Sequence, residues 1–118
     1  MISEDYVMRQ IDMAVRLIAR LVFKKDTAEY KIVPDEAAGC DILYLELMKL
    51  AGSGEINEAE NLLFERSDIN DLGFLEVAIA FYDKINNYGD AFLEISGYSR
   101  EEAKEGLGGM CELFGVSI

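Results

Sequence analysis

The chain has 118 residues, of which 51% are apolar and 29% charged, a composition typical of a folded domain rather than a disordered segment. It contains no histidine, the side chain that most often performs acid/base catalysis near neutral pH and binds transition metals. The net charge is −12, with six basic and five acidic side chains in residues 1–31 against five basic and eighteen acidic ones in residues 32–118. Because such an acidic body repels phosphate groups, we expect neither nucleic-acid nor membrane binding.

The first segment has the pattern of a helix with apolar residues on two faces. Ser3 is a good N-cap for it. One apolar face recurs at helical spacing and consists of Val7, Ile11, Ala14, Val15, Ile18, Leu21 and Val22. The opposite face carries Arg9, Arg16, Arg20 and Lys24, and a second apolar ridge of Tyr6, Met13 and Leu17 lies beside these cations. The helix has more apolar surface than one contact needs, which favours a homodimer through it.

The middle of the chain predicts three more helices. Residues 25–39 either extend the first helix or form a loop, in which Pro34 suits the first turn of a new helix and Asp41 suits an N-cap. Residues 42–51 and 72–87 are apolar on most sides, so we expect both helices at the centre of the fold. Residues 55–65 form a one-sided helix between them, and Asn70 or Asp71 caps the helix that follows.

The end of the chain predicts a short helix over residues 90–96 and a longer last helix. Gly97 closes the short helix, and Ser99 with Glu102 has the spacing of a capping box at the start of the last one. Gly115 ends it. Three glycines inside this helix, at positions 106, 108 and 109, indicate close helix packing. We therefore predict one all-α domain over residues 1–118, with five or six short helices as stacked αα-hairpins or a small irregular bundle.

Two resemblances support this fold class. The segment Gly54–Ala59, with Leu43, Leu50 and Leu63, resembles the turn and flanking positions of a tetratricopeptide repeat, while Leu47, Arg66 and Asp71 depart from that pattern. The whole chain resembles a family of small uncharacterised bacterial proteins, through Asp5–Arg9 near the start and Gly97–Glu102 near the end. That resemblance implies a repeat-like helical fold and no activity.

No segment has the residues of a catalytic or metal site. Cys40 and Cys111 form no metal-binding pair, and we expect two buried thiols in a reducing cytoplasm. The segment from Asp68 to Gly73 resembles the start of a calcium loop, but Leu72 and Ile79 occupy two ligand positions, so it is read as a turn and cap. We accordingly expect no cofactor, no bound metal and no enzymatic activity.

The basic face of the first helix is the surface most indicative of function. Arginine suits planar contacts with carboxylates, so we predict a docking face for a protein partner. Its residues are Arg9, Arg16, Arg20, Phe23 and Lys24. The leading interpretation is a scaffold or adaptor module of unknown specificity. Two alternatives stay open: a small-ligand binder or enzyme with a pocket around Tyr44, Tyr82 and Tyr88, and an acidic decoy for a basic nucleic-acid-binding protein.

Overall fold

The computed structural model describes residues 4–32 and 39–117. Those residues form six helices and no strand, which confirms the all-α prediction. The helices are α1 (Glu4–Phe23), α2 (Gly39–Gly52), α3 (Ile56–Arg66), α4 (Leu72–Asn86), α5 (Asp90–Ile95) and α6 (Arg100–Leu113). The predicted cap at Ser3 and the predicted role of Pro34 fall outside the described residues.

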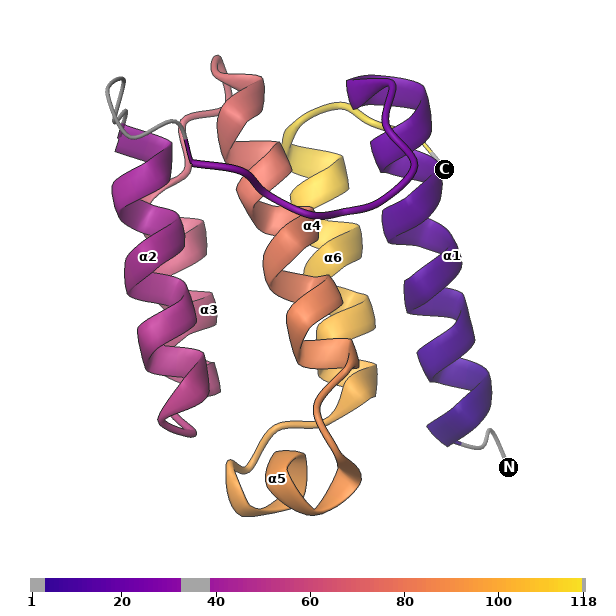
Figure 1. The fold of residues 1–118 in the computed structure, drawn as a ribbon, viewed down its shortest axis with the longest axis vertical. Coiled ribbons are helices and arrows are strands. Elements are labelled where there is room, and N and C mark those ends of the chain that lie inside the picture. The colour runs from indigo at the N-terminus through magenta and orange to yellow at the C-terminus, as the bar shows by residue number, and fades with distance from the viewer. Residues whose placement is uncertain (1–3, 33–38, 118) are drawn as a thin grey trace.

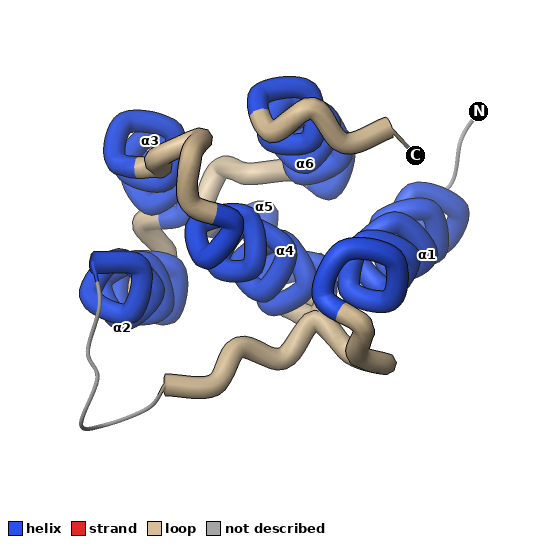
Figure 2. Tube along the Cα trace, turned by 90° about the horizontal axis from the view of Figure 1, so that it is seen from above, coloured by secondary structure: helices blue, strands red, loops and turns tan. Residues whose placement is uncertain are grey.

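Helix α4 occupies the centre of the molecule. Seen from above, it lies between the pair α2 and α3 on one side and the pair α1 and α6 on the other (Figure 2). It packs against α1, α2 and α6, and its residues 77–82 are all buried. Phe81 and Tyr82 are among the largest fully buried side chains. The prediction that the helix after Asp71 is central is therefore confirmed, and its near-encircling apolar surface is the cause.

The prediction that the second helix is also central is wrong. Helix α2 stands at the edge of the molecule, packed against α3 and α4 (Figure 1). It buries Leu43, Leu47 and Ala51, whereas Ile42 and Leu45 are 54% and 56% exposed. An apolar residue on every side of a helix therefore does not require a neighbour on every side, because single apolar side chains are common on protein surfaces.

Local capping signals in the sequence end and begin the helices as predicted. Asp71 caps α4 by accepting a 2.8 Å hydrogen bond from the Gly73 amide. Ser99 caps α6 and forms the full capping box with Glu102. Gly97 follows α5 with φ +66°, a left-handed conformation that glycine adopts without steric cost.

The chain leaves α1 as a loop rather than as a helical extension. Lys24 has φ +57°, and the Lys25 amide donates to the Ala19 carbonyl, which closes the helix end. Residues 24–32 then cross in front of α4 (Figure 1). Two side-chain contacts fasten this loop. Lys25 Nζ lies 2.8 Å from Glu76 Oε2, and the buried Tyr30 hydroxyl donates to Asp41 Oδ1.

Asp41 is not the N-cap that its sequence position suggested. Helix α2 already begins at Gly39, so Asp41 lies inside its first turn. The carboxylate is buried and accepts the Tyr30 hydroxyl, a contact across 11 positions that local sequence does not reveal. Burial, together with this carboxylate and Cys40, raises the pKa of Tyr30.

The three glycines of α6 have different surroundings, so the prediction of close packing is correct for some of them and wrong for Gly108. A side chain on Gly106 would meet Glu60 Oε2 at 2.1 Å and the Tyr82 hydroxyl at 2.3 Å. One on Gly109 would touch the Phe64 ring at 3.4 Å. Gly108 has nothing within 4 Å at the same point and faces open space.

Candidate protein-interaction face

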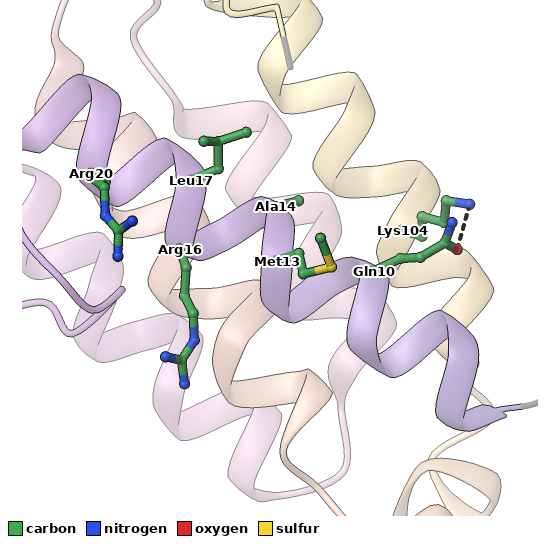
Figure 3. Close-up of a pocket in the computed structure, with 7 residues that line it drawn as sticks. All are labelled: Gln10, Met13, Ala14, Arg16, Leu17, Arg20 and Lys104. Atoms are coloured by element: carbon green, nitrogen blue, oxygen red, sulfur yellow. Dashed lines mark hydrogen bonds between the residues drawn. The ribbon is translucent and has the colours of Figure 1, made fainter.

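A groove of about 570 Å³ runs between α1 and α6 on the outside of the molecule (Figure 3). Its floor and one wall come from α1, and α6 contributes Lys104 to the opposite wall. The complete lining is Gln10, Met13, Ala14, Arg16, Leu17, Arg20 and Lys104. The groove therefore combines apolar side chains with three cations and no carboxylate.

Helix α1 builds the apolar part of this groove because its sequence carries more apolar residues than the core accepts. Val7, Ile11, Val15 and Ile18 are buried against the core. On the outer side, Met13 and Leu17 of the predicted second ridge are 70% and 42% exposed. Leu21, predicted on the other apolar face, is 56% exposed, and we name Met13, Leu17 and Leu21 the apolar ridge. Exposed apolar residues gathered along one helix are typical of a surface that binds another chain.

Three arginines flank the apolar ridge. Arg9, Arg16 and Arg20, here named the basic stripe, are all exposed and recur at spacings that place them on one side of the helix. Arg16 and Arg20 point away from α6 (Figure 3). Arg16 Nε donates to Asp12 Oδ1 at 3.1 Å, an exposed pair whose contribution to stability is small. The basic stripe is therefore exposed, and its contacts within the protein add little to the stability of the fold.

The structure places the five predicted partner-binding residues in different surroundings. Arg16 and Arg20 line the groove, and Arg9 lies about two turns before Arg16, with its Nε 3.4 Å from the Asp5 carbonyl oxygen. Phe23 is half-buried and packs against the core instead of projecting from the face. Lys24 lies after the helix end, and its ammonium donates to the Leu21 carbonyl at 3.1 Å.

Sequence reasoning missed the contribution of α6. Lys104 Nζ donates to Gln10 Oε1 at 2.9 Å across 94 positions, and this contact joins the two walls of the groove. No local pattern marks Lys104 as a neighbour of α1. The exposed ridge of Met13 and Leu17 was the one available signal for an apolar groove beside the arginines.

Helix α6 presents carboxylates next to this face. Glu101, Glu105 and Glu112, here named the acidic stripe, are exposed and share one side of the helix at i, i+4 and i+11. Lys104 adjoins α1, whereas Gly106 faces α3, so the acidic stripe lies on the solvent side between them. Helices α1 and α6 lie side by side and run in the same direction (Figure 1). The basic stripe on α1 and the acidic stripe on α6 therefore lie on opposite sides of the groove between them.

Two polar side chains near the core, Glu60 and Arg100, bond to groups on neighbouring elements. Glu60 Oε2 on α3 accepts the hydroxyls of Tyr82 at 2.7 Å and Tyr98 at 2.9 Å. Burial and this carboxylate raise the pKa of both tyrosines, which therefore stay protonated as donors. Arg100, 3% exposed, donates to the carbonyls of Asn86 and Tyr88 and so terminates α4.

The three tyrosines proposed for a small-ligand pocket lie in different places. Tyr82 is bonded to Glu60, Tyr44 packs its ring 4.7 Å from that of Tyr30, and Tyr88 packs 4.7 Å from Phe92. Within the described residues, no group of three or more Cys, Asp or Glu side chains is arranged to hold a metal ion. No helix in the described part of the chain is long and apolar enough to cross a membrane.

The fold and its surface define a small all-helical protein with an apolar groove between two parallel helices. The model of DUF6483, a family of unknown function, matches residues 1–115, and the chain belongs to this family. The expected resemblance to a family without assigned activity is confirmed at that level. Comparisons with curated proteins and with solved structures find no match.

Proposed function

We propose that this protein is a non-enzymatic protein–protein interaction module that binds its partner on the outward face of α1. The observation that carries the proposal is the groove between α1 and α6, with its apolar floor and its rim of Arg16, Arg20 and Lys104. A helix laid into an apolar groove is a common mode of recognition, in which apolar anchors give affinity and charges at the rim fix orientation.

The chemistry of the face specifies the partner surface that fits it. Apolar side chains are needed opposite Met13 and Leu17, and carboxylates are needed opposite the basic stripe, because arginine forms paired hydrogen bonds with planar carboxylates. The proposed partner surface is therefore an amphipathic helix with acidic residues beside its apolar side.

The absence of an enzymatic role is part of this proposal. The partly buried carboxylate of Glu60 already accepts two tyrosine hydroxyls, and the buried guanidinium of Arg100 is bonded to backbone carbonyls and to Asp90. Groups used in this way position helices and leave little capacity for proton transfer to a substrate.

The hairpin of α2 and α3 is the basis for a tetratricopeptide-like assignment, which we include in the proposal. The two helices pack against each other across the turn at Ser53–Gly54, where Gly54 has φ +86°. Ala59 is fully buried between apolar neighbours, as a small residue at a close helix contact should be. The hairpin supplies a frame, and α1 supplies the binding face.

The test is affinity capture from a lysate of cells that produce the protein, followed by mass spectrometry. The variant changes Arg9, Arg16 and Arg20 to Glu. A matched control changes the exposed Lys49, Arg66 and Lys84 to Glu, which alters the net charge equally on other surfaces. We expect partners held by wild type and by the control to be lost from the α1 variant. Equal capture by all three proteins would show that α1 is not the docking face.

A further inference from the structure

The outer face of α1 and α6 is self-complementary, and we propose that its occupant is a second copy of this chain. This inference rests on the proposed function, since it uses the same docking face. The face has three parallel parts: the basic stripe on α1, the apolar ridge of Met13, Leu17 and Leu21, and the acidic stripe on α6. A second copy offers the apolar ridge and the carboxylates that the basic stripe requires.

The order of the three parts selects one arrangement of the two copies. A two-fold axis parallel to α1 places ridge against ridge and exchanges the two sides, so that each basic stripe meets the acidic stripe of the other copy. In an antiparallel arrangement, the axis is perpendicular to α1 and each stripe faces the same stripe of the other copy. Arginines then lie against arginines and carboxylates against carboxylates. Because like charges in apposition are destabilising, the parallel two-fold dimer is favoured.

The contacts of this dimer follow from the positions along the helices. On a parallel two-fold axis, Met13 and Leu17 each face their own counterparts, as core residues do in a parallel coiled coil. Gln10 and Lys104 are hydrogen-bonded to each other and so mark the same level on α1 and α6.

The charge of the whole protein also favours this face over others. The chain carries −12 overall, so two copies repel each other through most surfaces. Arg9, Arg16 and Arg20 concentrate positive charge on α1, and Arg16 pairs with Asp12 of the same helix at 3.1 Å. In a dimer through this face, the basic stripe of each copy meets the acidic stripe of the other, beside Lys104, and the two-fold symmetry closes the assembly at two chains.

The decisive test is charge complementation between two variants, measured by sedimentation at one protein concentration. One variant changes Arg16 and Arg20 to Glu, and the other changes Glu105 and Glu112 to Arg. We expect wild type to be dimeric, each variant alone to be monomeric, and their equimolar mixture to regain the dimer, because both stripe contacts are then again of opposite charge. Circular dichroism confirms that each variant is folded.

Three outcomes would overturn the inference: a monomeric wild type, a dimer that survives in both variants, or a mixture that stays monomeric. None of these outcomes tests the proposed function, because the lysate experiment measures the binding of other proteins to α1. Conversely, an empty lysate capture beside a restored mixed dimer would refute binding of other proteins and support self-pairing.

A second measurement reports the direction of pairing without altering charge. In the Met13→Cys variant, a parallel dimer brings the two new thiols together, and air oxidation should give a disulfide-linked dimer. The control Ile95→Cys introduces an 86% exposed thiol on α5, away from the proposed interface. Faster cross-linking in Met13→Cys than in the control supports the parallel pair, and equal rates in the two variants overturn it.

Discussion

Two glycines of α6, two positions apart, should respond in opposite directions to the same substitution. Gly106 has no room for a side chain, because an added Cβ would lie 2.1 Å from Glu60 Oε2 and 2.3 Å from the Tyr82 hydroxyl. Gly108 has nothing within 4 Å. Both lie inside a helix, where replacing glycine by alanine stabilises the folded state by about 1 kcal/mol through backbone entropy and helix propensity. The two substitutions therefore share this gain and differ in packing.

The packing cost at Gly106 exceeds the gain. Tyr82 is fully buried and cannot retreat, so the Glu60 carboxylate must move and give up the hydroxyls it accepts. Each hydrogen bond to a charged group is worth about 1.5–3 kcal/mol, and crowding of a packed site adds about 1–3 kcal/mol. The two lost bonds and the crowding, less the gain of about 1 kcal/mol, should lower the free energy of unfolding of Gly106→Ala by about 3 kcal/mol or more, whereas Gly108→Ala should raise it by about 1 kcal/mol.

Urea melts of the two variants and wild type, at equal protein concentration, measure both effects. A change of 1 kcal/mol moves the melting temperature of a domain of this size by about 4 °C, so thermal melts give an independent reading. If Gly106→Ala is as stable as Gly108→Ala, the contact of α6 with Glu60 and Tyr82 has been wrongly described.

Four further predictions concern stability and reactivity. Phe81→Ala should cost about 3–5 kcal/mol because Phe81 is fully buried on the central helix, and a cost near zero in a urea melt would contradict that position. Arg100→Ala should cost about 3 kcal/mol by leaving buried carbonyls at the end of α4 unbonded, and Arg100→Lys should recover only part of it, since lysine lacks the planar fork. Burial, with the nearby charge of Asp12, raises the pKa of Asp83, so the folded state holds that proton more tightly than the unfolded chain does and loses the associated stability as pH rises through the raised pKa. The stability of Asp83→Asn relative to wild type should therefore increase between about pH 3 and pH 7, and a flat difference in melts across this range would refute the assignment. Burial also raises the pKa of the Cys111 thiol, which should resist iodoacetamide at neutral pH until denaturant is added; rapid labelling of the native protein, located by mass spectrometry, would contradict its burial.

The parts of the fold that could be predicted from sequence are those set by neighbours along the chain. The cap at Ser99, the cap at Asp71 and the helix end at Gly97 each depend on residues within a few positions, and the structure confirms all three. The central place of α4 followed from its nearly continuous apolar surface. Local backbone chemistry and burial pattern are sufficient for features of this kind.

The features that were not predicted depend on residues distant in the chain. The local sequence favours a cap at Asp41, because it does not show that Tyr30, 11 positions earlier, is the partner of this carboxylate. The apolar sequence of α2 favours a central position, because it does not show which helices pack against it. The same reason applies to the docking face. The arginines of α1 were identified by helical spacing, but their groove exists only because Lys104 of α6 lies beside Gln10.

The Glu60 cluster gives the protein an optical reporter of its own architecture. The chain has six tyrosines and no tryptophan, so its ultraviolet emission comes from tyrosine alone. A phenol that donates to a carboxylate can pass its proton to it in the excited state, which weakens the emission of that tyrosine. Tyr82 on α4 and Tyr98 before α6 share one acceptor on α3, so both are quenched while these three elements stay together. Their emission brightens when α3 separates, which makes that step visible without any attached dye.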